Sequence, residues 1–253
     1  MRYSKRKQRP RGGVTAAVIV SAGLAVGLSA TTAGGASGAE AATQSPPDTS
    51  LTHGIATNYA PTPQGNCSYP TQPSNGLYAA LPPSEYDNGA ACGEYLNVTG
   101  PDGQTVKAEV TDQCPECGPG HVDLSQPTFS RLAPLPDGLI NVSYQVAPNP
   151  PLPAAIAVTV KPGSSANWLA LLPQNTGNPL SSVQVQNSSG GWDSLTQSGY
   201  GYWIAQQGEG PGPFTVRLTD TQGHTATVSN IQLNPGQTQT TGTWMYGNGT
   251  APL

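Results

Sequence analysis

Residues 111–129 bring together several side chains that can do chemistry. The segment reads TDQCPECGPGHVDLSQPTF and contains two aspartates, a CxxC pair and a histidine, namely Asp112, Cys114, Cys117, His121 and Asp123. The aspartates can act as acids or as hydrogen-bond acceptors. The cysteines and the histidine can bind zinc, or the cysteines can form a disulfide that braces a turn.

The two aspartates have competing interpretations. Asp112 follows the alternating strand pattern VKAEV, so it can face a groove and hydrogen-bond a glycosidic oxygen, or it can cap the turn through backbone amides. Asp123 shares one side of an extended segment with His121 if Val122 and Leu124 are buried. Alternatively, Asp123 caps the helix that we expect to follow, where a carboxylate is favoured.

The cysteine count favours disulfides over metal. Cys67, Cys92, Cys114 and Cys117 are the four cysteines, and an even number in a secreted chain predicts two disulfides. A second CxxC is missing, so we expect no metal site and no cofactor. No βαβ pattern surrounds the CxxC, which argues against a redox site.

Hydrolysis of a glycosidic bond normally needs two carboxylates. No Asp or Glu occurs between Asp48 and Glu85, so the strand GIATNYAP contributes none. If Asp123 caps a helix, it is a poor base for activating water. The sequence therefore disfavours hydrolysis and predicts a protein that is not an enzyme.

The N-terminus and the charge balance indicate the compartment and the partners. Residues 1–41 combine a basic start, an apolar run rich in small residues and the small-x-small site AEA, which predicts a secretory signal peptide and an extracellular protein. Removing it leaves four basic and thirteen acidic residues. Such a chain is a poor fit for nucleic acid or anionic membranes, and neutral polysaccharide is the better partner. We expect a monomer.

The remaining chain predicts an all-β protein of two domains. Many short alternating runs are separated by Gly and Pro, with a hairpin at 101–103 and one helix in DLSQPTFSRLA capped by Ser125. Leu124, Phe129 and Leu132 are expected on the buried face of that helix. Residues 238–253 are expected to fray. The predicted boundaries are a flexible lead-in at 42–52, a first domain at 53–147, a Pro-rich linker at 148–153 and a β-sandwich at 154–247.

Aromatic residues are the main candidates in the second domain. Trp168 and Trp192 lie near strand patterns, and Tyr200, Tyr202 and Trp203 lie in SGYGYWIAQ. On a strand the two tyrosines share one face and Trp203 takes the other, so one set should be core and one exposed. Exposed aromatic rings can stack on the apolar C–H faces of sugars; the alternative is that all of them are core.

The motifs GIATNY, ACGEYLNVTGPDG, VTDQCPECGPGHVDLS, KPGSSANW and FTVRLTDTQGH resemble those of bacterial expansins. The resemblance covers residues 54 to about 233. It implies a six-stranded double-psi β-barrel, similar to that of family-45 endoglucanases, followed by an immunoglobulin-like sandwich of carbohydrate-binding module family 63.

The resemblance also implies the binding residues. Asp112 matches the groove aspartate, Thr57 a groove threonine and Asp123 a second aspartate. Tyr59 stands where a groove threonine is found, and Cys114 stands at a groove tyrosine. On the sandwich, the matching residues of the glycan-facing surface are Lys161, Trp168 and Tyr200. Asn167 replaces a second tryptophan there, and the family-45 base would fall near Pro61.

The predicted function is non-hydrolytic loosening of wall polysaccharide, with cellulose or another neutral β-glucan as the partner. One alternative is a lytic transglycosylase, which can work with a single aspartate, or a weak glycoside hydrolase. A further alternative is an inhibitor module, as in secreted barwin-like proteins, although the attached sandwich argues against it.

Overall fold

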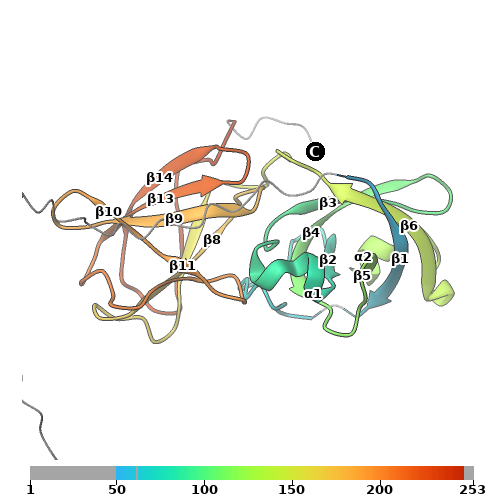
Figure 1. Ribbon diagram of the computed structural model, residues 1–253, viewed down its shortest axis with the longest axis horizontal. Helices are drawn as coiled ribbons and strands as arrows, with labels where there is room; N and C mark the ends of the chain where they lie inside the picture. The colour runs from blue at the N-terminus through green and yellow to red at the C-terminus, as the bar shows by residue number, and fades with distance from the viewer. Residues whose placement is uncertain (1–49, 61, 248–253) are drawn as a thin grey trace, which may run out of the picture. The chain divides into compact units, whose positions relative to one another are not determined.

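The computed structural model describes residues 50–60 and 62–247. These residues form a closed barrel followed by a region of two further sheets (Figure 1). The predicted signal peptide lies outside the described residues, as does nearly all of the predicted lead-in. Among the residues that are described, no helix is long and apolar enough to cross a membrane.

The barrel closes in the strand order β1-β5-β2-β4-β3-β6. Its strands are β1 (Thr52–Tyr59), β2 (Tyr78–Leu81), β3 (Tyr95–Thr99), β4 (Thr105–Gln113), β5 (His121–Ser125) and β6 (Leu139–Val146). The pairs β1/β5 and β2/β4 are parallel, and the other four pairs are antiparallel. The predicted all-β fold with a six-stranded double-psi barrel is confirmed, and so is the hairpin at 101–103, which joins β3 to β4.

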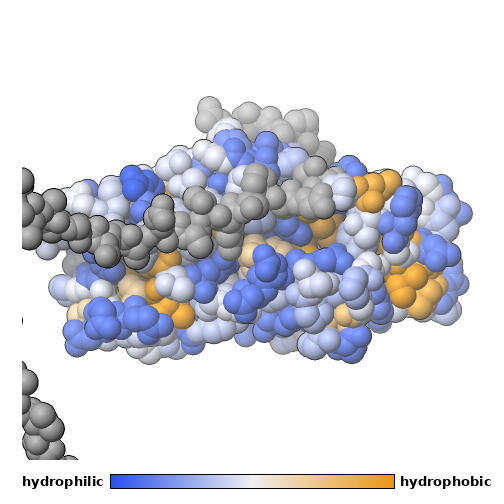
Figure 2. Space-filling model, viewed as in Figure 1, coloured by the Kyte–Doolittle hydropathy of each residue, from blue (hydrophilic) through white to orange (hydrophobic). Residues whose placement is uncertain are grey.

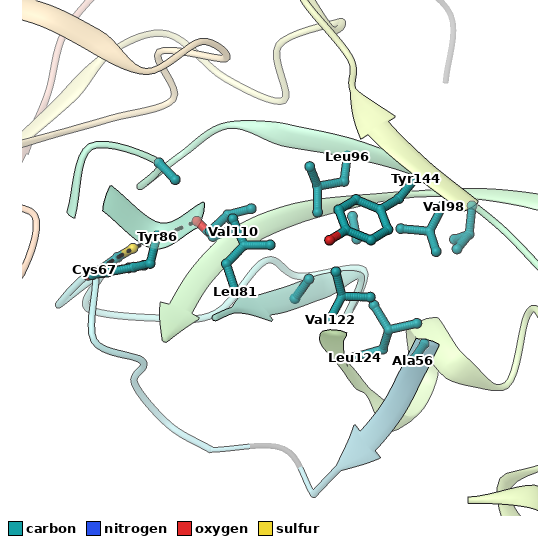
Figure 3. Close-up of a cluster of buried hydrophobic side chains, with 14 of the residues drawn as sticks. Ala56, Cys67, Leu81, Tyr86, Leu96, Val98, Val110, Val122, Leu124 and Tyr144 are labelled. Carbon is teal, nitrogen blue, oxygen red and sulfur yellow. Dashed lines mark hydrogen bonds between the residues drawn. The ribbon is translucent and has the colours of Figure 1, made fainter. Parts of the chain in front are cut away.

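Alternation along the strands builds the barrel core. Val122 and Leu124 of β5 are fully buried, whereas His121 and Asp123 are half-exposed. Val98 of β3 and Val110 of β4 belong to the same buried cluster (Figure 3). Gly54 of β1 lies against the Gly120 backbone so closely that any side chain would collide with it. The chain can therefore bring β1 alongside the start of β5 only with glycine at this position.

The helices are short. They are α1 (Pro83–Tyr86), η1 (Asp87–Gly89), α2 (Gln126–Phe129) and η2 (Leu135–Asp137). Ser125 caps α2 as predicted, because its side chain accepts a hydrogen bond from the Thr128 amide at 3.2 Å. The interpretation of Asp123 as the helix cap is wrong, because Ser125 takes that position and Asp123 lies within β5.

The second region is a sandwich of two sheets, β10-β9-β13-β14 and β11-β12-β8-β7-β15. Its strands are β7 (Ala157–Val160), β8 (Leu169–Gln174), β9 (Leu180–Gln186), β10 (Trp192–Ser194), β11 (Thr196–Gln197), β12 (Trp203–Ala205), β13 (Phe214–Asp220), β14 (Thr225–Ile231) and β15 (Thr238–Thr240). Alternating apolar side chains of both sheets, such as Val158, Val183 and Leu218, form its core.

Two expectations about the sandwich are wrong. Tyr202 and Trp203 are both buried, because Tyr202 packs into one apolar cluster and Trp203 into another. Residues 238–247 are not frayed, and the rest of that expectation, residues 248–253, lies outside the described residues. Thr238–Thr240 form β15, which pairs with β7, and Tyr246 lies against the His224 ring with centroids 4.7 Å apart.

The surface is mostly hydrophilic. Figure 2 shows small, separate apolar patches on a polar background. Among the described residues, the exposed large hydrophobic side chains are Leu51, Leu135, Leu139 and Tyr200. Of these, only Tyr200 belongs to the predicted binding residues.

Candidate functional site

The parallel pairing of β1 with β5 places three polar side chains together. Thr57 is the register partner of Asp123, and Ile55 is the partner of His121. Thr57 Oγ1 donates a hydrogen bond to Asp123 Oδ1 at 2.6 Å and lies 2.9 Å from His121 Nε2. Since Val122 and Leu124 are buried in the core, His121 and Asp123 point to the opposite side, as predicted for an extended segment.

The environment of Asp123 is partly desolvated. Burial raises the pKa of its carboxyl group above the usual value, and the hydrogen bond from Thr57 and the nearby His121 oppose that shift. The negative charges of Glu116 and Asp112 raise the pKa further. The electrostatic influence of Asp112 indicates that the two aspartates share one region of the barrel.

Strand β2 lies between the two aspartates. Ala80 is the register partner of Asp112 in β4 and also of Asp123 in β5. The register shifts between Ala79 and Ala80, and this irregularity brings Asp112 opposite Ala80. Two flanking strands lie roughly 10 Å apart, so the aspartates stand on either side of one small residue. Because cross-strand partners point to the same side of a sheet, both aspartates lie on the side of Ala80; the shared groove stays a prediction.

Asp112 is held by the backbone. Its Oδ1 accepts hydrogen bonds from the Asn66 amide at 2.7 Å and the Gln113 amide at 2.8 Å. Gly65 approaches the Asp112 side chain closely enough that a Cβ there would collide with it. The turn interpretation of Asp112 is therefore partly correct, because its own neighbour donates one bond. The second bond comes from a loop 46 residues earlier in the sequence.

Tyr59 and the Cys114–Cys117 disulfide form one wall of this region. Tyr59 packs against both cysteines and Ala80, and its ring meets Tyr78 edge to face at 5.9 Å. Burial, and then the charges of Asp112 and Asp123, raise the pKa of the Tyr59 hydroxyl well above its usual value. That hydroxyl is buried and has no hydrogen-bond partner among the described residues.

The four cysteines form two disulfides, Cys67–Cys92 and Cys114–Cys117. The sequence predicted two disulfides, and the structure supplies the pairing. Among residues 50–60 and 62–247, no cluster of three or more His, Cys, Asp or Glu side chains is arranged to bind a metal ion.

The sandwich residues form a separate group. Lys161 Nζ lies 5.9 Å from the centroid of the Tyr200 ring and 5.4 Å from that of Tyr202. Tyr200 is 36% exposed, whereas Tyr202 is buried beneath it at a ring distance of 5.8 Å. Lys161 directly follows β7, and Trp168 directly precedes β8. Trp168 is half-buried and forms an isolated bridge with Ser165 of the connecting loop.

The structure thus places the predicted residues in two groups. Thr57, Tyr59, Asp112 and Asp123 lie together at one end of the barrel strands, and Lys161 and Tyr200 lie together on the sandwich. The sequence reasoning did not identify Asn66, whose amide holds Asp112. Only the fold shows this contact, since a loop amide carries no signature in the sequence.

Comparisons with known proteins agree with this architecture. Residues 78–144 match the family model described as "Lytic transglycolase", and residues 156–232 match the "Expansin C-terminal domain" model. The class is therefore a two-domain protein with a double-psi barrel and an expansin-type sandwich.

Relatives and solved structures identify the family. Expansin-like protein 1 of Dictyostelium discoideum is 33% identical over 69% of this chain and 65% of its own length. Expansin-like protein 5 of the same organism is 32% identical over 64% of this chain and 72% of its own. The crystal structure of the Clavibacter michiganensis expansin has a TM-score of 0.74 and 38% identity, covering 78% of this chain and 99% of that one. The chain belongs to the expansin family.

A mutant of that Clavibacter expansin has been crystallised in complex with cellohexaose. The alignment spans just under two thirds of Expansin-like protein 1.

Proposed function

We propose that this chain is a secreted, monomeric expansin that binds neutral β-glucan in cell walls and loosens it without cutting it. The observation that carries the proposal is the pair of aspartates, Asp112 and Asp123, that flank Ala80 at one end of the barrel. The similarity to an expansin that was crystallised with cellohexaose supports a β-glucan as the ligand.

In this proposal Asp112 binds the glycan directly. Both hydrogen bonds from the Asn66 and Gln113 amides end on Oδ1, so Oδ2 can accept a hydrogen bond from a glucan hydroxyl. A carboxylate held by backbone amides is pre-oriented, and hydrogen bonds to an ionised acceptor are strong. Such bonds compete with the hydrogen bonds between neighbouring glucan chains, and this competition would loosen the chains.

The proposed absence of hydrolysis depends on Asp123. Its Oδ1 already accepts a hydrogen bond from the Thr57 hydroxyl at 2.6 Å. Thr57 is the register partner of Asp123 in the parallel strand pair β1/β5, so the strand pairing keeps the two side chains together. Activation of water would require a carboxylate that faces the water and is free to take its proton. In the proposed role, Asp123 and Thr57 together form a polar floor that orients sugar hydroxyls.

The sandwich contributes a second contact in this proposal. Lys161, Trp168 and Tyr200 bind the apolar C–H faces and hydroxyls of glucose units, with Tyr200 held by the nearby ammonium group.

A second candidate function is lytic transglycosylase activity. The match of residues 78–144 to the "Lytic transglycolase" model favours it specifically. In that reaction one carboxyl group donates its proton to the leaving glycosidic oxygen and then takes the proton of the 6-hydroxyl, which attacks the anomeric carbon of the same muramoyl residue, so one acidic residue can suffice. Asp112 is the candidate for that acid.

The test is to incubate the chain without residues 1–41 with insoluble cellulose and, separately, with peptidoglycan. Depletion of the protein reports binding, and mass spectrometry of the supernatant reports soluble fragments. Extension of a cellulose sheet under constant load reports loosening. Binding and extension without fragments are the expected results on cellulose.

Asp112→Ala is expected to abolish extension while leaving most of the binding through the sandwich. Asp102→Ala is the matched control, because Asp102 is an exposed aspartate in the β3–β4 hairpin of the same barrel. Extension by Asp112→Ala at the wild-type rate would refute the role of Asp112. Fragments that disappear in Asp112→Ala would show an enzyme, and 1,6-anhydro ends would identify the transglycosylase.

A further inference from the structure

The sheet β10-β9-β13-β14 has an outer face of unusual composition. Its inward side chains, such as Val183, Val185 and Leu218, are buried in the sandwich core. Its outward residues include Gln184, Gln186, Trp192, Ser194, Arg217 and Thr227. The other outward residues are Ser or Thr, apart from the exposed Asn230 near the end of β14. No Asp, Glu or Lys occupies an outward position on these four strands.

Trp192 is the only aromatic side chain on this face, and its orientation is fixed. Arg217 Nε and Nη2 both donate to Gln184 Oε1, at 2.9 Å and 2.6 Å. The guanidinium carbon lies 4.2 Å from the centroid of the Trp192 ring. This stacking of a guanidinium on an indole is a favourable cation–π arrangement.

The strand order determines how the indole lies. Trp192 is on the edge strand β10 and Arg217 is on β13, with β9 between them. These outer strands are roughly 10 Å apart, and Gln184 of β9 holds the guanidinium between them, so the indole meets it above β9. Arg217 covers one ring face, and among the described residues no other aromatic ring or cation stacks on Trp192. Trp192 is accordingly half-buried rather than core.

The other sheet of the sandwich differs in how far its outward side chains are covered. Its outward residues Ala170, Leu172 and Tyr202 are buried in a large apolar cluster that is separate from the sandwich core. Lys161, the half-buried Trp168 and Tyr200 lie at its periphery and form the surface that the proposed function assigns to a ligand. The outer face around Trp192 is flat and polar, and its side chains do not enter either of the two large apolar clusters.

We propose that the outer face of the β10-β9-β13-β14 sheet is a second glycan-contact surface, centred on Trp192, which binds an extended neutral β-glucan chain. The indole stacks on a pyranose ring, and the neighbouring Gln, Ser and Thr side chains exchange hydrogen bonds with sugar hydroxyls. The sandwich then contacts glycan on both of its sheets. This inference rests on the proposed function of the protein.

Charge supports a neutral ligand. Residues 154–247 contain three acidic residues and two basic ones, and the outer face itself carries only Arg217, whose guanidinium is already engaged. An anionic polymer would need several free cations, and a cationic polymer would need free carboxylates. The surface offers neither, whereas it offers many uncharged donors and acceptors.

The test measures depletion of the chain without residues 1–41 onto insoluble cellulose, for the wild type and four variants. Trp192→Ala is expected to weaken binding about 3- to 10-fold, as is typical for loss of one aromatic stacking contact. Arg217→Lys keeps the charge but loses the planar stack, and about a twofold loss is expected. Asp193→Asn is the matched control on the same strand, because Asp193 points to the other side of the sheet, and its binding should not change.

Trp168→Ala separates this inference from the proposed function. If Trp168→Ala weakens binding while Trp192→Ala and Arg217→Lys bind like the wild type, the second surface is refuted and the proposed function stands. If the wild type binds no glucan, both are refuted. Should Trp192→Ala fail to fold, as judged by circular dichroism, Arg217→Lys decides: a loss supports the surface, and unchanged binding refutes it.

Discussion

The barrel and the sandwich differ sharply in charge and in covalent bracing. Residues 53–147 contain nine acidic residues, two basic residues and all four cysteines, whereas residues 154–247 contain three acidic residues, two basic residues and no cysteine. Both disulfides therefore brace the barrel. All four tryptophans, in contrast, belong to the sandwich.

This contrast shows two ways to build a binding surface. The barrel buries carboxyl groups such as Glu94 and positions Asp112 and Asp123 through strand register, so its surface acts through charge and hydrogen bonds. The sandwich presents aromatic rings and uncharged polar side chains on flat sheets. The barrel has two disulfides and buried carboxyl groups in addition to its apolar core, whereas the sandwich has an apolar core and no disulfide.

The largest expected effect concerns the Cys67–Cys92 disulfide, which joins residues 25 apart in the sequence. Replacing both cysteines by serine should destabilise the barrel by about 3–4 kcal/mol, because the open loop gains conformational entropy in the unfolded state. Urea unfolding monitored by circular dichroism reports on both domains, whereas tryptophan fluorescence reports on the sandwich alone.

The expected result is that only the circular dichroism transition moves to lower urea. The double serine variant of Cys114 and Cys117, which lie three residues apart, is the matched control and should shift it less. A fluorescence transition that moves equally would show that the two domains unfold as one unit.

The next effect is the pH dependence of the barrel. Burial, with a smaller contribution from the charge of Glu85, raises the pKa of Glu94 to about 8. The folded state therefore keeps a proton on Glu94 that the unfolded chain releases near pH 4.5. The contribution of protonated Glu94 to the free energy of unfolding is fully present below about pH 4.5 and is lost as the pH rises through about 8. Between pH 5 and pH 8 the loss should be about 3 kcal/mol.

Glu94→Gln should reduce this pH dependence, as measured by urea unfolding at several pH values. Some dependence should remain, because burial also raises the pKa of Glu109 to about 7. Asp102→Asn, an exposed site in the same barrel, should leave the profile unchanged. A Glu94→Gln profile as steep as that of the wild type would contradict the prediction.

The third effect tests the sandwich. The buried Asp220 carboxylate accepts hydrogen bonds from Asn178 Nδ2 at 2.7 Å and from the amides of Gln222 and His224 at 3.0 and 2.8 Å. Asp220→Ala leaves these donors unpaired and should cost about 2 kcal/mol. The tryptophan fluorescence transition should move, whereas Asp193→Ala at an exposed position should leave it nearly unchanged. No shift in Asp220→Ala would mean that water replaces the carboxylate.

The smallest effect is on binding. Trp168→Ala should weaken partition onto cellulose by about 1 kcal/mol, because one half-buried ring no longer stacks on the glucan. Asn167→Ala, at the exposed neighbouring position, is the control and should bind as the wild type does. Unchanged binding by Trp168→Ala would remove Trp168 from the proposed surface.

Much of the fold was predictable because local patterns matched the tertiary structure. Alternating stretches such as FTVRLTD correspond to observed strands, and Ser125 followed by QPTF correctly indicated a capped helix. The short strands β10, β11 and β15 were not predicted, because two or three residues are too few to show a period. The exposure of Tyr202 was misjudged, because Tyr202 lies just before β12 and packs into one apolar cluster while the adjacent Trp203 packs into another.

The all-β class, the disulfide-forming cysteines, the family and the short segment that contains Asp112 and Asp123 could all be predicted from the sequence. These follow from composition and local spacing, which tertiary contacts do not alter. The three-dimensional structure was needed to show that Ala80 separates the two aspartates, that the Asn66 amide holds Asp112 and that Arg217 stacks on Trp192. Each of these depends on strand order and register, and residues far apart in the sequence meet only when the sheets close.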